Sequence, residues 1–261
     1  MAILSDMKPF RVFGELYFVG SSRVSSHIIN TKNGLVLIDT GYPDMYEEIS
    51  ESIKALGFNP ENITAILHTH GHIDHYGCTE SFVKISGAKT YISEIDNDIV
   101  NGKLDLSWAN ELDLPRVSPF DCDVLIKDGD VLDFGEVSIR CVLAPGHTIG
   151  TLVFFITMND GDTTATLAMH GGVGLLSMEK AVLEKYSLPL EIRDIFREGL
   201  HALANEKVDI VLGTHPEQND TKGKYEILNS GGSIIDGGEW QRFLLGREKL
   251  LDDMLAKENS N

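Results

Sequence analysis

The first part of the chain contains short apolar segments, rich in β-branched and aromatic residues, that are typical of strands. Residues 11–19, 26–30 and 34–39 fit this pattern, and the turn Lys32-Asn33-Gly34 predicts a hairpin between the last two segments. Apolar residues then recur at helical spacing from Met45 to Leu56, and Gly57 ends the pattern. The opening part is therefore predicted to be a β-meander followed by a helix.

The next segment changes abruptly from apolar to polar. Residues 63–67 form a short apolar run that predicts a buried strand, and residues 68–75 form a polar string rich in histidine. A helix is predicted over 76–85 and a strand over 89–92, so the string lies on a strand-to-helix loop. Residues 95–120 show little periodicity, and they are interpreted either as a flap over a cleft or as an ordinary surface excursion.

The second half repeats this organisation. Strands are predicted over residues 124–126, 131–134, 137–143, 151–156, 164–169 and 210–212. An apolar stripe from Ile192 to Leu203 predicts a helix, and residues 239–257 predict an amphipathic C-terminal helix. No low-complexity linker separates the halves. We therefore expect one domain over residues 1–261, in which two sheets pack face to face between outer layers of helices.

The charge of the chain narrows the range of partners. It has 22 lysines and arginines against 40 aspartates and glutamates, which gives a formal net charge of −18. A surface this acidic repels phosphate backbones and anionic headgroups, so nucleic acid and membranes are not expected partners. The expected partner is a small-molecule substrate, with the protein a monomer or, through its C-terminal helix, a homodimer.

The compartment is predicted from the first residues and the cysteines. The first 30 residues lack a basic start followed by a continuous apolar stretch and a small-residue cleavage site, and no window approaches 18 apolar residues. Three cysteines without CxxC spacing fit a reducing compartment better than a disulfide framework. A cytoplasmic protein is expected.

Four histidines and one aspartate stand within residues 68–75. Imidazole nitrogen and carboxylate oxygen are the donors that suit zinc and related divalent ions. His70 and His72 occupy alternate positions and point the same way, whereas Asp74 and His75 begin the next turn and can face a second ion. The cluster predicts a metal site on this loop.

Two further histidines lie on similar loops. His147 follows the predicted strand 137–143, and His215 follows the predicted strand 210–212, so three loops would converge at one edge of the sheets. His27, in a strand, and His201, on a helix, are interpreted as structural residues. His68 ends the strand before the cluster and is assigned a packing or orienting role.

Three motifs in this order resemble the metallo-β-lactamase superfamily: His70-Gly71-His72-Ile73-Asp74-His75, Pro145-Gly146-His147-Thr148 and Gly213-Thr214-His215-Pro216. Residues 37–41 and 127–130 also resemble sequence segments of that superfamily. The resemblance implies an α/β (α+β) fold, a four-layer αββα sandwich of two mixed β-sheets with a binuclear metal site at one edge. By this resemblance His70, His72 and His147 would bind the first ion, and Asp74, His75 and His215 the second. The cofactors expected are two divalent ions, zinc first, with iron or manganese as alternatives.

The chain also departs from the family pattern. Many members carry a Gly-Asp pair whose carboxylate bridges the two metals, but residues 167–173 contain no acid. Val173 stands where one lactamase subclass has a cysteine ligand, so the chain is most similar to the third, histidine-rich subclass. His170 is the candidate substrate-binding residue. It could also pack behind the site or act as a ligand, although a neutral imidazole bridges two metals poorly.

The resemblance implies a metal-dependent hydrolase. A metal-bound hydroxide would attack a small carbonyl substrate such as a β-lactam-like amide, a lactone or a thioester, and Asp74 would be the catalytic residue that orients it. An iron-dependent redox enzyme of the same fold is one alternative, although flavin-linked members usually carry Glu where His72 stands. A non-catalytic binding protein is another, which would predict lost ligands.

Overall fold

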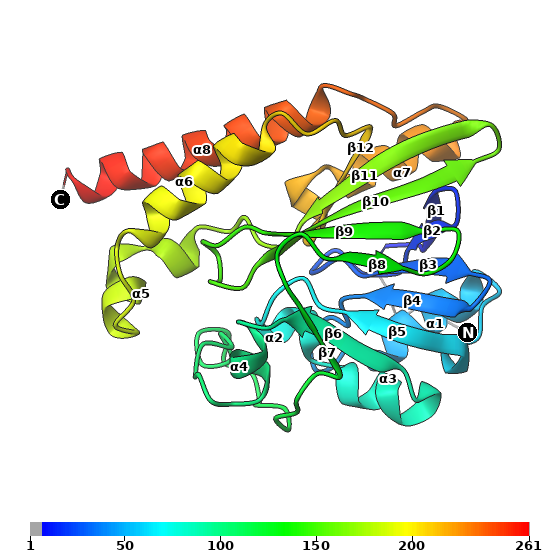
Figure 1. The fold of residues 1–261 in the computed structure, drawn as a ribbon, viewed down its shortest axis with the longest axis horizontal. Coiled ribbons are helices and arrows are strands. Elements are labelled where there is room, and N and C mark those ends of the chain that lie inside the picture. Colours follow the sequence, from blue (N-terminus) through cyan, green and yellow to red (C-terminus); the bar gives the residue numbers. More distant parts are fainter. Residues whose placement is uncertain (1–6, 261) are drawn as a thin grey trace.

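Two β-sheets lie face to face, and helices cover the outer face of each (Figure 1). The computed structural model of the protein describes residues 7–260, so residues 1–6 and 261 of the predicted domain lie outside the described residues. Both sheets contain parallel and antiparallel pairs. The predicted αββα sandwich of two mixed sheets is thereby confirmed.

The first sheet is antiparallel at its start and parallel at its end. Its seven strands, in the order β1-β2-β3-β4-β5-β6-β7, are β1 (Phe10–Phe13), β2 (Leu16–Phe18), β3 (His27–Thr31), β4 (Gly34–Ile38), β5 (Ile63–Leu67), β6 (Lys89–Ser93) and β7 (Val124–Ile126). Pairing is antiparallel from β1 to β4 and parallel from β4 to β7. The carboxyl ends of β4, β5 and β6 therefore meet at one edge of the sheet.

The second sheet has five strands in the order β12-β11-β10-β9-β8. These are β8 (Val131–Asp133), β9 (Ser138–Leu143), β10 (Leu152–Asp160), β11 (Thr163–His170) and β12 (Ile210–Gly213). Because β10 is antiparallel to both β9 and β11, and β11 is parallel to β12, the strands β9, β11 and β12 run in the same direction. Their carboxyl ends also lie at a common edge.

The helices are α1 (Tyr46–Ala55), α2 (Ile73–Tyr76), α3 (Thr79–Ser86), α4 (Asn97–Val100), α5 (Lys180–Lys185), α6 (Ile192–Leu203), α7 (Thr221–Asn229) and α8 (Glu239–Glu258). Three short 3₁₀ turns, Pro60–Asn62, Leu176–Met178 and Pro216–Gln218, lie between them. Within residues 7–260 no helix is both long enough and apolar enough to cross a membrane.

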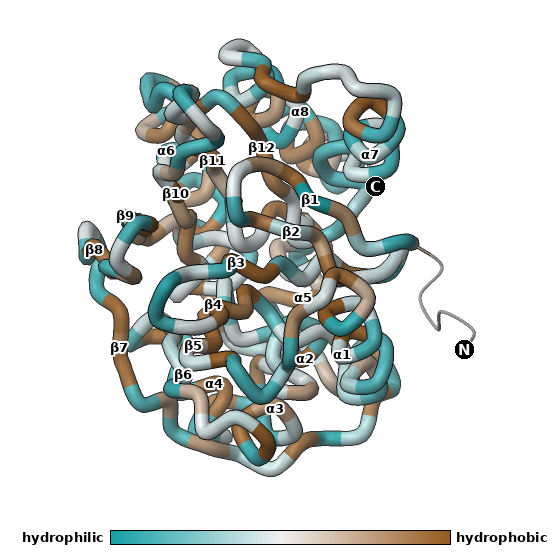
Figure 2. The backbone as a smooth tube through the Cα atoms, turned by 90° about the vertical axis from the view of Figure 1, so that its right-hand side faces the viewer, coloured by the Kyte–Doolittle hydropathy of each residue, from teal (hydrophilic) through white to brown (hydrophobic). Residues whose placement is uncertain are grey.

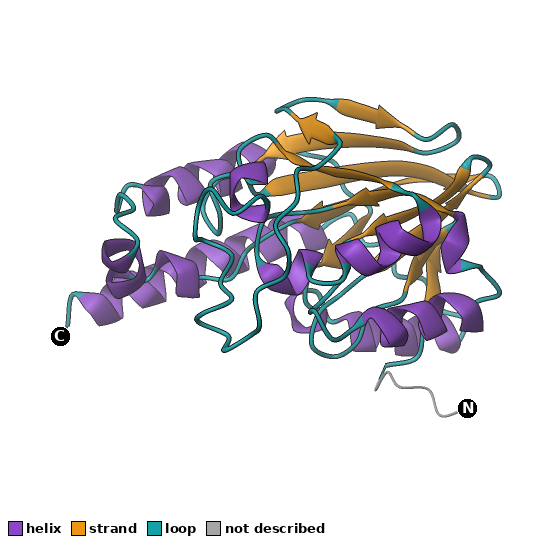
Figure 3. Cartoon of the chain, turned by 90° about the horizontal axis from the view of Figure 1, so that it is seen from below, coloured by secondary structure: helices purple, strands orange, loops and turns teal. Residues whose placement is uncertain are grey.

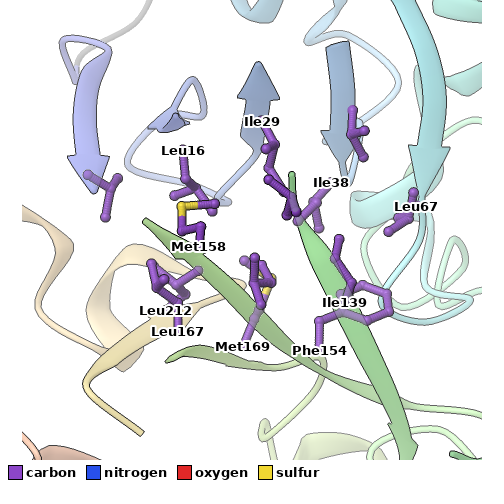
Figure 4. Close-up of a cluster of buried hydrophobic side chains, with 14 of the residues drawn as sticks. Leu16, Ile29, Ile38, Leu67, Ile139, Phe154, Met158, Leu167, Met169 and Leu212 are labelled. Atoms are coloured by element: carbon purple, nitrogen blue, oxygen red, sulfur yellow. The ribbon is translucent and has the colours of Figure 1, made fainter. Parts of the chain in front are cut away.

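The main core lies between the two sheets (Figure 4). Leu16, Ile29, Ile38 and Leu67 point from the first sheet toward Phe154, Met169 and Leu212 of the second. These side chains are at most 2% exposed, so the two facing surfaces of the sheets are apolar. Hydrophobic segments accordingly follow many of the strands in Figure 2, and hydrophilic segments lie in the peripheral turns.

Each outer face has a core of its own. On the first sheet, Met45, Ile49 and Ile53 in and before α1 pack with Phe82 of α3, and these helices lie in front of the strands in Figure 3. On the second sheet, the predicted stripe of α6 packs with α8 over Val153, Phe155 and Val211, and the two helices lie side by side in Figure 1. This packing places helices outside both sheets.

The structure corrects several predicted elements. Residues 11–19 are not one strand: β1 and β2 form a hairpin, and Gly14 turns the chain with φ +51° where a Cβ would lie 2.6 Å from the Asn159 carbonyl oxygen. The predicted helix 76–85 is divided into α2 and α3. The short helices α4, α5 and α7 were not predicted, because four to nine residues carry little periodic signal.

Candidate metal centre

The loop between β5 and α2 carries the histidine cluster. Leu67 is the last residue of β5 and Ile73 the first of α2, so residues 68–72 cross the edge where the carboxyl ends of the strands meet. His147 follows β9 and His215 follows β12 at the same edge. The three loops therefore converge, as the order of the strands predicts.

The side chains form two groups of three. The ligand atoms of His70, His72 and His147 lie within 4.8 Å of one another, and so do those of Asp74, His75 and His215. The two groups adjoin, because the ring centroids of His70 and His75 are 4.2 Å apart. Either group could hold one metal ion.

The nitrogen and oxygen atoms within each group are close. His72 Nδ1 lies 3.0 Å from His147 Nε2. Asp74 Oδ2 lies 3.4 Å from His75 Nε2 and 3.5 Å from His215 Nε2. Such convergence of buried donors is costly unless a proton or a cation lies between them.

In most of these histidines, Nδ1 makes a hydrogen bond to a neighbouring protein group, and Nε2 faces the candidate metal position. His147 Nδ1 donates to the Gly174 carbonyl at 2.8 Å, and His215 Nδ1 donates to the Arg23 carbonyl at 2.8 Å. The Nε2 atoms of His70 and His75 are buried and have no hydrogen-bond partner among residues 7–260. A carbonyl or carboxylate behind each imidazole is the usual arrangement of metal-binding histidines, so this donor set fits metal ions.

Asp39 holds ligands of both groups. Its Oδ2 accepts from His75 Nδ1 at 2.9 Å and from Thr69 Oγ1 at 2.7 Å, and the Thr69 oxygen lies 3.0 Å from His70 Nδ1. Its Oδ1 accepts from the Thr69 N–H at 2.9 Å. Asp39 follows β4 directly and has φ +57°, a strained value that turns its carboxylate toward the loop.

Asp96 ties the first histidine loop to the loop of His147. Its buried carboxylate accepts from the Gly71 N–H at 2.8 Å, the Gly150 N–H at 2.8 Å and the Thr148 hydroxyl at 2.6 Å. Burial raises its pKa to about 6 despite these three donors. Sequence reasoning did not identify this residue, because a single aspartate in an aperiodic segment carries no local signal.

The two groups differ in the charge state of their histidines. Burial lowers the pKa of His70 and His72 well below the usual value and that of His147 to about 4, so these imidazoles are neutral and keep a free lone pair. Burial opposes the charged forms of His75 and Asp74 as well, but the combined attraction of the neighbouring opposite charges outweighs burial in both pKa values. The carboxylates of Asp74 and Asp39 raise the pKa of His75 to about 10, and His75 with His215 holds the pKa of Asp74 below its usual range.

His170 lies behind the site, at the end of β11. It is 1% exposed, and its Nδ1 accepts from the Gly172 N–H at 3.4 Å. The centroid of its ring lies 6.2 Å from that of the Phe196 ring, in an edge-to-face arrangement. Among residues 7–260 it belongs to neither group of ligand atoms. The geometry therefore gives it packing contacts, and its role toward substrate stays a prediction.

The remaining histidines lie outside the two groups. His68 Nε2 lies 3.2 Å from Thr79 Oγ1, with its ring against Tyr76 and Phe120. His27 is buried in β3 against Phe18, and His201 on α6 pairs with Glu248 of α8.

A glycine turn after β11 leaves room for the site. A Cβ on Gly171 would lie 2.3 Å from the Leu152 carbonyl oxygen, and a Cβ on Gly172 would lie 2.3 Å from Cδ2 of His147. Only glycine lets this turn pass so close to a ligand side chain.

The fold and the paired donor groups define a metal-binding αββα protein. The chain belongs to the metallo-beta-lactamase superfamily, whose family profile matches residues 19–161. It is similar to a subclass B3 metallo-beta-lactamase of Bradyrhizobium japonicum, with a TM-score of 0.88 and 26% identity over 99% of this chain and 97% of that one. The native FEZ-1 metallo-beta-lactamase from Legionella gormanii gives a TM-score of 0.88 and 25% identity, covering 98% of each chain. The predicted likeness to the third lactamase subclass is confirmed by these neighbours.

Relatives found by sequence match a shorter part of the chain. An uncharacterized protein from Aquifex aeolicus is 28% identical over 159 residues, which cover 60% of this chain and 71% of that protein. The chain spans about half the length, 49%, of the mycobacterial relatives that it also matches.

Proposed function

We propose that this protein is a hydrolase that uses two divalent metal ions, zinc first, to cleave a small carbonyl substrate such as a lactam, lactone or thioester. The observation that carries the proposal is the pair of adjoining donor groups, His70, His72 and His147 beside Asp74, His75 and His215. Family membership supports hydrolysis with metal ions, and one distant relative is named a probable metallo-hydrolase. The structural neighbours favour a carbonyl substrate.

The donor chemistry supports zinc. Three protein ligands to an ion leave a position for water or substrate, which is the arrangement of catalytic rather than structural zinc sites. Iron and manganese also accept imidazole and carboxylate, so metal analysis has to decide among them. When bound, a pair of such ions would polarise the substrate carbonyl and lower the pKa of water between them.

The protein's own groups would position the reaction. Asp74 is 6% exposed, and its Oδ2 lies close to the Nε2 atoms of both His75 and His215. It would accept a hydrogen bond from the attacking water and orient it. Asp39 would fix His75 and, through Thr69, His70. No serine or cysteine nucleophile is required, and Cys78, Cys122 and Cys141 are all buried.

The replacement Asp74→Ala tests this function. We expect the variant to lose an ion from the second group, and to lose thioester or lactone hydrolysis by a factor of about a hundred or more, because one ligand and one orienting carboxylate are removed. Elemental analysis of purified protein and steady-state rates measure both. The exposed Asp162→Ala variant is the control and should keep both properties. Unchanged turnover in Asp74→Ala, or an absence of metal after reconstitution of the wild type, would contradict the proposal.

A further inference from the structure

A pocket opens from the first donor group. His72 and His147 form part of its wall, and the rest is almost entirely apolar. The pocket is narrow, with a cavity volume of about 50 Å³, and one side of it is open to solvent. Its other walls come from Ile99 of α4, from the segment that carries Trp108, and from Val182 of α5. In Figure 1, α4 and α5 lie on the same side of the molecule.

Trp108 is held in a strained backbone conformation at this pocket. Its φ is +67°, a left-handed backbone conformation that is rare for a bulky side chain. The indole ring lies 5.4 Å from the His72 ring, at an interplanar angle of 34°. The backbone strain therefore directs a large apolar surface to the boundary between the pocket and the first donor group.

The segment of Trp108 is fastened across the pocket to α5. The carboxylate of Glu111 accepts hydrogen bonds from the Lys185 ammonium and the Tyr186 hydroxyl, and Tyr186 also lines the pocket. On the other side, Ala109 packs with Ile73 and Tyr76 of α2. The apolar walls are therefore fixed in place rather than formed by a free loop.

Only the first donor group borders the pocket: His72 and His147 are among its lining residues, and Asp74, His75 and His215 are not. In the second group, the His215 side chain is 23% exposed. The part of the substrate that enters the pocket therefore lies against the first group, and a leaving group can depart past His215. Thr148, Ser177 and Tyr186 also line the pocket, but most of its surface is apolar. A polar substituent there would lose its hydration and gain few hydrogen bonds in exchange.

We propose that the pocket binds an apolar acyl chain attached to the scissile carbonyl, so that the preferred substrates are esters, thioesters or lactones of medium-chain acids. The acyl chain lies between Trp108 and Val182, and the carbonyl carbon lies beside His72 and His147. This inference rests on the proposed hydrolase function and adds the chemical class of its substrate.

The first experiment uses ethyl thioesters with acyl chains from acetyl to octanoyl, so that the leaving group stays small and constant. For the metal-loaded enzyme we expect kcat/KM to rise roughly fourfold per methylene over the first few, and about a hundredfold in total, as each CH₂ leaves water. Equal rates for acetyl and octanoyl thioesters would overturn the proposal. A chain-length dependence on the thiol side alone would overturn it as well.

A matched pair of variants locates the effect. Val182→Phe fills the pocket and should reduce the octanoyl-to-acetyl ratio by about tenfold or more, because several methylenes lose their site. Val131→Phe makes the same change on β8 at a side chain that is 59% exposed, and it should keep the wild-type ratio. A wild-type ratio in Val182→Phe would contradict the assignment of the pocket.

A binding measurement separates the pocket from catalysis. The sequence has two tryptophans, and Trp108 lines the pocket while Trp240 is fully buried in the core. Titration of the metal-free protein with 1-octanol should change the Trp108 fluorescence, with 1-butanol binding about tenfold or more weakly. If octanol binds but no thioester is hydrolysed, the proposed function fails and the apolar site stands. If thioesters are hydrolysed but octanol does not bind, the function stands and the apolar site fails.

Discussion

At the scale of single residues, Asp39 orients ligands of both donor groups although it lies far from them in the sequence. The sequence around Asp39 indicates only a resemblance to the family. Its contacts with Thr69 and His75 depend on the fold, because 30 and 36 residues separate the partners. The ligand histidines, by contrast, were readable from sequence, since four of them stand together in residues 68–75. Ligand residues are recognisable in a sequence because several histidines and carboxylates stand close together. The residues that orient these ligands can come from any element nearby.

The replacement Asp39→Asn should weaken metal binding at both groups. The amide keeps the shape of the carboxylate but places an N–H₂ against donors, so His75 and Thr69 lose their acceptor. We expect metal affinity to fall about 10–100-fold, measured by competition with a chelator of known affinity. The exposed Asp194→Asn variant on α6 controls for the loss of charge. Wild-type affinity in Asp39→Asn would show that this carboxylate is dispensable.

At the scale of elements, the long periodic segments were predictable and the connections were not. The run 63–67 coincides with β5 and the stripe 192–203 with α6, because burial of one face imposes a period on many residues. The split of 11–19 into two strands depends on one glycine, and the place of Trp108 depends on contacts with α2 and α5. Such features are determined by tertiary packing.

The glycine turn after β11 gives a prediction at this scale. Gly172→Ala should displace His147, because the added Cβ would lie 2.3 Å from its ring, and the first group should lose its ion. The control Gly199→Ala lies in α6 with no heavy atom within 4 Å of the added Cβ. It should keep the full metal content and raise the free energy of unfolding by about 0.5–1 kcal/mol. Metal analysis and denaturant unfolding test both; a full complement of metal in Gly172→Ala would contradict the packing argument.

At the scale of the whole molecule, buried neutral histidines make stability depend on pH. Burial lowers the pKa of His27 from 6.5 to about 4 and that of His68 to about 4. Between pH 6.5 and 4 the unfolded chain therefore binds protons that the folded chain does not. The contribution of these two histidines to stability is complete above pH 6.5 and falls as the pH drops toward 4.

His27 lies outside the donor groups, so it tests this effect separately. In His27→Phe the slope of unfolding free energy against pH should decrease by about 1.4 kcal/mol per pH unit between pH 6 and 4.5, because one proton is no longer taken up on unfolding. Denaturant unfolding in a chelating buffer measures the slope. His27→Gln, which also cannot titrate, should give the same slope; a change seen only with Phe would indicate packing rather than protonation.

The position of Asp39 between the two donor groups also affects the order and affinity with which the protein binds two metal ions. An ion held by His70 and an ion held by His75 both depend on the orientation of one carboxylate. Occupancy of either position restricts that carboxylate and thereby lowers the ordering cost at the other. Loading should accordingly be cooperative, with the second ion binding more tightly than the first. By thermodynamic reciprocity, removal of either ion should weaken the binding of the other to the same extent.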